Sequence, residues 1–140
     1  MRVKDILGKI MVKEIMNTEL PALNPSMTVI DALKDKFLQI DYGTLPITSE
    51  NKILGILTLL NVKRLPRSKW NTIKVSDVMD RVSKNNTLNL ADRAIVALTK
   101  MIKTRLDLLP VVEDSKLIGV VTQDDLLRLI DHMKDADSPY

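Results

Sequence analysis

The strongest constraint on the fold is a pattern that occurs twice in the chain. The repeated residues stand in the same order and 64 positions apart: Pro46 and Pro110, Gly55 and Gly119, Thr58 and Thr122. Three residue types with different structural roles keep one spacing, which indicates that one supersecondary unit was duplicated. Because each unit of such a repeat buries its apolar face against its neighbour, we expect the function to lie between the two copies.

Composition narrows the class of protein. The 140 residues are 45% hydrophobic and 28% charged, which is the size and balance of one globular domain. No apolar run approaches the ~20 residues of a membrane span. The first five residues alternate charged and apolar side chains, without the apolar stretch of a signal peptide. We therefore expect a cytoplasmic protein without membrane contact.

Residues that carry chemistry are scarce. The chain has no cysteine, and His132 is its only histidine. Disulfides, thiolate metal sites and a cysteine nucleophile are thereby excluded, and zinc or serine–histidine chemistry within one chain is nearly excluded. We expect no enzyme, no metal site and no required cofactor. The net charge of +3 is a mild bias toward anionic partners.

Apolar periodicity in the second copy predicts the order helix, strand, helix, strand, strand, helix. A short opening helix (75–79) and a strand (86–90) precede a helix that starts near Ala91. The residues expected on its buried face are Ala91, Ala94, Ile95, Leu98, Met101 and Ile102. Strands 108–112 and 117–121 form an antiparallel hairpin. The last helix (123–134) should bury Leu126, Leu127, Ile130 and Met133.

The first copy follows the same plan. An opening segment (12–16), a strand (20–23) and a helix (28–40) lead to strands near 44–48 and 53–57. Between the copies, residues 63–70 are basic and contain Trp70, the only tryptophan. We expect Trp70 to pack this linker against the repeats while its charged neighbours stay in solvent.

These motifs together resemble the cystathionine-β-synthase (CBS) domain, and the chain resembles a stand-alone tandem pair of such domains. The likeness rests on the opening segments Val12-Lys13-Glu14-Ile15-Met16 and Val75-Ser76-Asp77-Val78-Met79, the Leu-Pro strands and the Gly-apolar-apolar-Thr turns. It implies an α/β (α+β-like) fold of two repeated units around a pseudo-two-fold axis. We divide the chain into an N-terminal extension (1–11), two units (12–66 and 75–134), a linker (67–74) and a tail (135–140).

The resemblance also implies a function. Members of the family mostly regulate an associated protein, and they bind AMP, ADP, ATP or S-adenosylmethionine in clefts between the repeats. Pairs of such chains usually join through their helices into a homodimer. We therefore expect a non-catalytic, energy-sensing regulator that forms a homodimer and signals to an unknown partner.

The family's ligand motif, Gly-apolar-apolar-Thr-x-x-Asp, is intact in the second copy as Gly119-Val120-Val121-Thr122-Gln123-Asp124-Asp125. By resemblance, Thr122 faces phosphate or ribose, Asp125 accepts hydrogen bonds from the ribose diol, and the Val120 backbone lies beside adenine. The first strand of the opposite copy would complete this cleft with Thr18, Leu20 and Pro21. The alternative interpretation is a helix cap, because Thr122 and Asp125 have the spacing of a capping box.

The first copy departs from the motif and is expected to form a weaker second site. Its sequence Gly55-Ile56-Leu57-Thr58-Leu59-Leu60-Asn61 has an amide in place of the acid. The residues assigned to this weaker site are Ile56, Thr58 and Asn61, with Arg81, Val82 and Ser83 from the opposite copy.

Phosphate ligands in the family are often held by His or Arg just before the Leu-Pro pair. Here those positions are Gly43-Thr44 and Asp107-Leu108. This favours a ligand of low negative charge, such as AMP or S-adenosylmethionine, over ATP. Cations that could assist are Lys63, Arg64, Lys103 and Arg105.

Two other functions compete with ligand sensing. One is a purely structural dimerisation scaffold whose clefts no longer bind anything, which the Asn61 substitution favours. The other is an accessory protein that binds nucleic acid through the basic linker, in which case binding would be strongly salt-dependent. We do not expect nucleic-acid binding, because Trp70 is the only aromatic residue in the linker available for base stacking.

Overall fold

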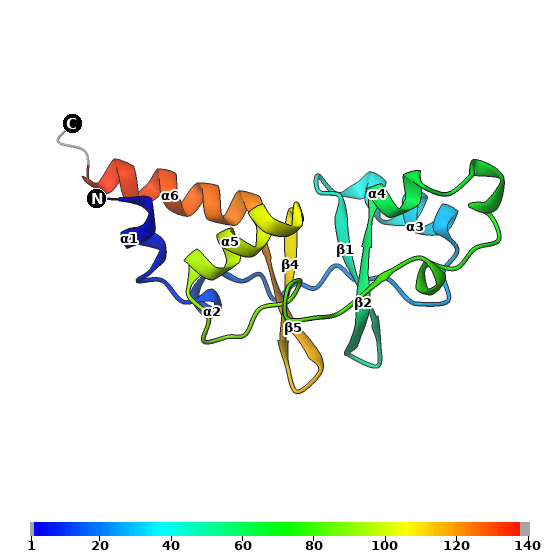
Figure 1. The fold of residues 1–140 in the computed structure, drawn as a ribbon, viewed down its shortest axis with the longest axis horizontal. Coiled ribbons are helices and arrows are strands. Elements are labelled where there is room, and N and C mark those ends of the chain that lie inside the picture. The colour runs from blue at the N-terminus through cyan, green and yellow to red at the C-terminus, as the bar shows by residue number, and fades with distance from the viewer. Residues whose placement is uncertain (1, 138–140) are drawn as a thin grey trace.

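The computed structural model describes residues 2–137, and Figure 1 shows two similar halves side by side. Each half has one antiparallel hairpin with helices at its open end. The strands are β1 (Thr44–Ser49), β2 (Lys52–Thr58), β3 (Asp80–Arg81), β4 (Leu108–Glu113) and β5 (Lys116–Thr122). The fold is a mixture of helices and antiparallel sheet built from two repeats, as predicted.

The helices flank these hairpins. They are α1 (Val3–Leu7), α2 (Val12–Ile15), α3 (Val29–Asp35), α4 (Leu59–Lys63), α5 (Ala94–Thr104) and α6 (Gln123–Asp137). Three short 3₁₀ turns complete the set: η1 (Phe37–Gln39), η2 (Arg67–Lys69) and η3 (Val75–Asp77). Within residues 2–137, no helix is both long and apolar enough to cross a membrane. Of the predicted tail, residues 135–137 continue α6, and 138–140 lie outside the described residues.

The two hairpins have the same geometry. In the β1–β2 turn, Glu50 and Asn51 have φ of 52° and 69°, and in the β4–β5 turn Asp114 and Ser115 have φ of 50° and 66°. Two successive residues with positive φ form a type I′ turn, whose twist matches that of an antiparallel pair. The predicted hairpins are therefore confirmed, with matching pairs such as Leu45 opposite Leu57 and Leu109 opposite Val121.

The hairpins meet at their turns, on the pseudo-two-fold axis. The Ile53 N–H donates to the Ser115 carbonyl oxygen, and the Leu117 N–H donates to the Asn51 carbonyl oxygen, both at 3.0 Å. The two bonds join equivalent residues of the two copies, because Ile53 and Leu117 are 64 positions apart, as are Asn51 and Ser115. The strand order is therefore β1-β2-β5-β4.

The opening segments are exchanged between the halves. In Figure 1 the chain crosses from the second half to the first after α2, and back after η3. The Val12 N–H donates to the Asp92 carbonyl oxygen at 2.8 Å, and Val75 N–H donates to the Met27 carbonyl oxygen at 2.9 Å. Asn17 pairs with Val120 of β5, and β3 pairs with β2. Each copy thus begins in the opposite half.

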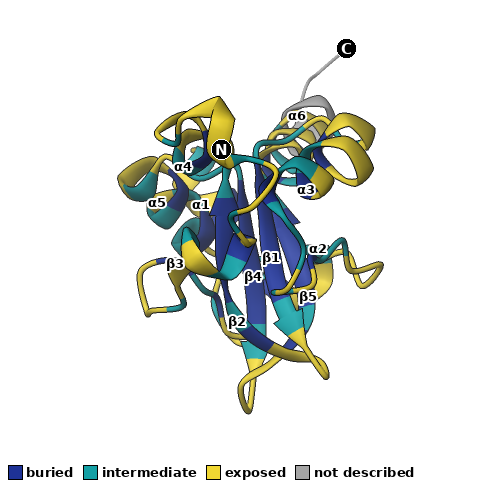
Figure 2. Ribbon diagram, turned by 90° about the vertical axis from the view of Figure 1, so that its right-hand side faces the viewer, coloured by how far each residue is buried: buried dark blue, intermediate teal, exposed yellow. Residues whose placement is uncertain are grey.

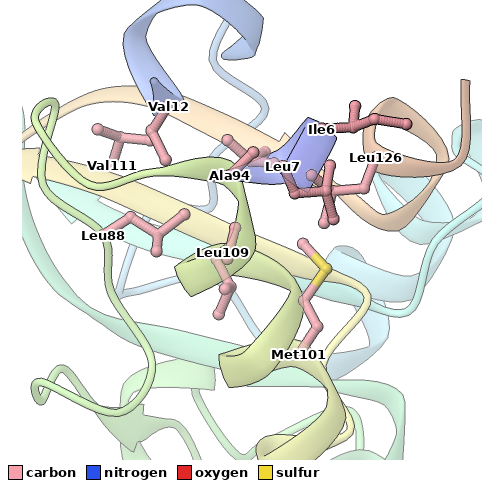
Figure 3. Close-up of a cluster of buried hydrophobic side chains, with 11 residues drawn as sticks. Ile6, Leu7, Val12, Leu88, Ala94, Met101, Leu109, Val111 and Leu126 are labelled. Carbon is pink, nitrogen blue, oxygen red and sulfur yellow. The ribbon is translucent and has the colours of Figure 1, made fainter. Parts of the chain in front are cut away.

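Each half has its own apolar core, which the exchanged segments help to fill. Figure 2 shows the strands as the buried centre and the turns as exposed. In the second half, side chains from α1, α2, α5, β4 and α6 pack together (Figure 3). Ile6 and Leu7 of α1 lie beside Leu126 of α6 in this cluster, so the predicted N-terminal extension is part of the core.

The linker occupies the corresponding place in the first half. Trp70 packs against the core of that half, and its carbonyl oxygen accepts from the Ile30 N–H at 2.9 Å. The Arg67 guanidinium lies 5.8 Å from the centre of the Trp70 ring, within cation–π range. The basic residues of the linker are exposed. The predicted role of Trp70 is confirmed.

Several details of the predicted helices are wrong. Helix α5 begins at Ala94, so Ala91 lies outside it and is exposed, and Ile102 is 69% exposed. Its buried face is Ala94, Ala97 and Met101. The reason is that the segment before Arg93 forms a turn, in which the Asn89 N–H donates to the Asp92 carboxylate (2.8 Å), and the helix starts later than the apolar pattern.

The other differences follow from tertiary packing. Leu127 of α6 is half exposed rather than inward. The predicted helix 28–40 ends at Asp35 and continues as η1, which keeps Phe37 buried. The predicted strands 20–23 and 86–90 are reduced to isolated bridges at Leu23 and Leu88, because each makes only a brief contact with a neighbouring hairpin.

We expect the two repeat glycines to differ in their tolerance of alanine. A Cβ at Gly55 would clash with the Asp80 backbone carbonyl, whereas a Cβ at Gly119 would lie 2.6 Å from the flexible Met16 Sδ. Gly55→Ala should therefore lower the free energy of unfolding by about 2–3 kcal/mol and Gly119→Ala by about 1 kcal/mol. Urea denaturation of both variants measures this, and equal losses would contradict the proposed role of the close backbone approach.

Candidate functional site

A cleft lies between the halves, next to the altered motif of the first copy. We call it the Asn61 cleft; its volume is about 410 Å³, within the usual range for small-molecule sites. Both copies contribute to its lining, which consists of Gly43, Thr44, Thr58, Leu59, Leu60, Asn61, Arg64, Asp80, Thr104, Arg105, Leu106 and Asp107. This cleft therefore lies at the first-copy motif, in which Asn61 replaces the aspartate.

Asn61 is held in place at the start of α4. Its N–H donates to the Thr58 hydroxyl oxygen (3.1 Å), which caps the helix. Its side-chain nitrogen donates to the Val78 carbonyl oxygen and to the Asp80 carboxylate, each at 3.2 Å. Both side-chain bonds use the amide nitrogen, so the amide oxygen can still accept a hydrogen bond. Asp80 places a carboxylate beside the position where the motif has lost one.

Two arginines line this cleft, together with the carboxylates of Asp80 and Asp107. Arg64 follows α4, and Arg105 follows α5 with a left-handed backbone (φ 61°). The Arg105 N–H donates to the Met101 carbonyl oxygen at 2.8 Å, which closes the end of α5 and orients the turn. Guanidinium groups are suited to phosphate recognition because they donate two parallel hydrogen bonds.

The intact motif borders a much smaller space. This Asp125 hollow has a volume of about 70 Å³, room for a water molecule or two, and its lining is Asp41, Tyr42, Asp107, Thr122, Gln123 and Asp124. Its lining residues are acidic or neutral. The volumes therefore rank the two clefts in the opposite order to the one predicted from the motif.

Thr122 and Asp125 form a reciprocal cap at the start of α6. The Thr122 N–H donates to Asp125 Oδ2 (2.9 Å), and the Asp125 N–H donates to Thr122 Oγ1 (3.2 Å). Asp125 Oδ1 also accepts from Arg128 at 2.7 Å. This is the geometry of the capping box that we considered as the alternative interpretation. Both carboxylate oxygens are engaged within the protein.

Tyr42 lines the hollow beside this cap. Burial raises the pKa of its phenol above 10.0, and the charges of Asp125, Asp107 and Asp41 raise the pKa further, in that order of importance. Three carboxylates therefore lie near one phenol. A ligand with a phosphate group would meet unfavourable charge here.

Asp107 lies between the two spaces and lines both. Its Oδ2 accepts from the N–H of Gly43, its own counterpart 64 positions earlier, at 2.8 Å. Its Oδ1 is buried and has no hydrogen-bond partner among the described residues. One carboxylate thus connects the walls of both clefts.

Of the two exchanged segments, only the second reaches one of these clefts, through Asp80. Gly119 and Val120 are buried in β5, and Ile56 is buried in β2 opposite Asp80. Thr18, Leu20 and Pro21 follow the Asn17–Val120 bridge but do not line the Asp125 hollow. Arg81, Val82 and Ser83 do not line the Asn61 cleft.

The sequence analysis missed several residues that the structure brings to the clefts. Asp80, Tyr42 and Asp41 were not proposed, although Arg64 and Arg105 were considered as possible cations. The available signal was the repeat spacing: Asp41 corresponds to Arg105, and Tyr42 corresponds to Leu106. Within the described part of the chain, no three acidic or histidine side chains gather as a metal site.

Comparison with known proteins agrees with this architecture. The model of the CBS domain family matches residues 12–67 and 75–132. CBS domain-containing protein YhcV of Bacillus subtilis (strain 168) is 27% identical over 119 residues, which cover 82% of this chain and 81% of the relative.

Solved structures of similar shape include a CBS domain pair. CBSX2 in complex with AMP has a TM-score of 0.71 at 25% identity, over 89% of this chain and 98% of that one. The CBS domain pair of protein MJ0100, in complex with 5′-methylthioadenosine and S-adenosyl-L-methionine, has a TM-score of 0.72 at 24% identity, over 88% and 97%. Two family matches in one chain, with the fold of a CBS pair, show that this protein belongs to the CBS domain family.

Proposed function

We propose that this protein is a regulatory, non-catalytic CBS pair that binds an adenosine-containing ligand between its repeats and signals to a partner protein. The observation that carries the proposal is the Asn61 cleft, a space of about 410 Å³ walled by both copies and by two arginines. The AMP complex of CBSX2 supports an adenine nucleotide as the ligand. AMP is the simplest candidate; ADP, ATP and S-adenosylmethionine remain alternatives.

The chemistry of the cleft suits the two polar ends of AMP. Arg64 and Arg105 would neutralise the phosphate. The ribose diol needs hydrogen-bond acceptors, which the Asn61 amide oxygen and the Asp80 carboxylate can supply. In this proposal Asp80, contributed by the exchanged strand, replaces the acid that the motif has lost at position 61.

The Asp125 hollow is the weaker site in this proposal. Binding at Thr122 and Asp125 would require the hollow of about 70 Å³ to widen and Asp125 to give up its bonds to Thr122 and Arg128. Both changes cost free energy that binding at the Asn61 cleft does not. Thr18, Leu20 and Pro21 would reach a ligand here only after such a rearrangement.

A homodimer is part of the proposal. Leu38 and Ile102, which are 64 positions apart, are 77% and 69% exposed, and Leu60 and Leu127 are also exposed. Leu38 and Ile102 are equivalent positions on the helical side of the two halves, and a symmetric dimer would cover these exposed apolar side chains. A cytoplasmic location and energy sensing follow from the same proposal, and the regulated partner is unknown.

The two competing functions, a structural scaffold and a nucleic-acid-binding accessory protein, predict different binding behaviour. A structural scaffold would form the dimer but bind no adenosine ligand. A nucleic-acid accessory protein would use the exposed basic linker, around Lys63 and Arg67, and would lose binding steeply as salt rises. The two-copy cleft favours the ligand-binding proposal over both.

We expect calorimetry to show AMP binding that depends on the two arginines. Arg64→Gln and Arg105→Gln should each weaken AMP binding about tenfold, because each removes a charge-assisted hydrogen bond to phosphate. Arg128→Gln is the matched control, since Arg128 is the counterpart of Arg64 in the other half. Wild-type protein that binds none of AMP, ADP, ATP or S-adenosylmethionine would favour the scaffold.

Asp125→Ala separates the cap from the ligand site. Loss of the cap should lower the free energy of unfolding by about 1 kcal/mol, while AMP affinity should stay within about twofold because the ligand lies in the Asn61 cleft. Thermal melting and calorimetry on the same variant measure both. A tenfold loss of AMP affinity would instead place the ligand beside Asp125.

Light scattering tests the dimer. At micromolar concentration the protein should have about twice the 15.8 kDa mass of the chain. Replacing Leu38 and Ile102 together by Glu should give monomers, because charged groups cannot be buried unpaired at the interface. A wild-type monomer would contradict the proposed assembly.

A further inference from the structure

A second groove runs along α5 and reaches the Asn61 cleft. This α5 groove has a volume of about 430 Å³, and its lining is Asn85, Ile95, Val96, Thr99, Lys100, Lys103 and Thr104. Thr104 lines both the groove and the Asn61 cleft. The two spaces therefore border each other at the C-terminal end of α5.

The groove has a preformed wall. On α5, Val96, Thr99, Lys100 and Lys103 have the spacing of one helix face. The opposite side is the loop after β3, where the Ser83 N–H donates to Asn86 Oδ1 (2.8 Å) and the Asn86 side chain donates to the Arg81 carbonyl oxygen (3.0 Å). Asn86 is buried, so this loop is fixed from within and carries Asn85 on the groove.

The charge of the groove is positive. Its lining contains two lysines and no carboxylate. Lys100 Nζ donates to the Thr87 carbonyl oxygen at 2.7 Å, which fixes the ammonium group and leaves two of its three donors for another acceptor. Lys103 is exposed one helical turn further on. The adjoining Asn61 cleft adds Arg64 and Arg105, together with the carboxylates of Asp80 and Asp107.

We propose that the α5 groove binds the distal phosphates of an adenine nucleotide whose nucleoside occupies the Asn61 cleft. This inference rests on the proposed function and specifies its ligand class as a nucleoside di- or triphosphate. The sequence analysis favoured a ligand of low negative charge. That expectation was based only on the residues before the Leu-Pro pairs. The cations that suit additional phosphates are on α5.

Calorimetry with adenosine, AMP, ADP and ATP in buffer containing a metal chelator tests the groove. Affinity should rise with each phosphate, and ATP should bind roughly tenfold more tightly than AMP. Lys103→Glu should remove this gain while leaving AMP affinity within about twofold. Lys36→Glu is the control, because Lys36 is an exposed lysine of the first half that lines neither the groove nor the Asn61 cleft. It should leave the affinities for all four ligands unchanged.

The outcomes separate this inference from the proposed function. If none of the four ligands binds, the proposed function fails. If AMP binds but ATP binds no more tightly, or if Lys103→Glu weakens AMP and ATP equally, only the α5 groove is rejected. Lys103→Ala provides a milder variant if the charge reversal impairs folding, and it should reduce the gain from the additional phosphates in the same direction.

Discussion

The structure depends on the close passage of each opening segment across the hairpin of the other half. Met16 lies against Gly119, and Met79 and Asp80 lie against Gly55, where the Asp80 backbone leaves no room for a Cβ. Each half therefore includes chain from both copies, and its core includes side chains from both. Neither copy can bury its apolar face or complete a cleft alone, so the pair folds as one unit. The ligand clefts are a consequence of this exchange, because the exchanged β3 supplies Asp80 to the Asn61 cleft.

The two clefts share one backbone plan but differ in chemistry. Equivalent positions carry Arg105 and Asp41, Leu106 and Tyr42, and Asn61 and Asp125. Arginine and leucine line the cleft of about 410 Å³, whereas aspartate and tyrosine line the acidic hollow of about 70 Å³. The intact motif is used as a helix cap, with Asp125 bound to Thr122 and Arg128. Asp107 touches both spaces and bonds Gly43, so the walls of the two clefts are not independent.

Local patterns predicted the elements whose conformation is locally determined. The hairpins were found because continuous apolar strands flank short turns, and the family was recognised because its motifs occur twice in order. The faces of the helices were less accurate. Ala91, Ile102 and Leu127 fit the apolar pattern of a helix, yet all three are exposed. The spacing of apolar residues states which side chains share a face, but it does not state whether another element covers that face.

By itself, the sequence determined the duplication, the family and the chemical classes that one histidine and no cysteine exclude. The tertiary structure alone decided which cleft has space, that Tyr42 lines the smaller one, and that Asp80 lies beside Asn61. The physical reason is that motif residues a few positions apart are related by local backbone geometry. The walls of the clefts are formed by residues from opposite copies, and their separation depends on how the two halves pack.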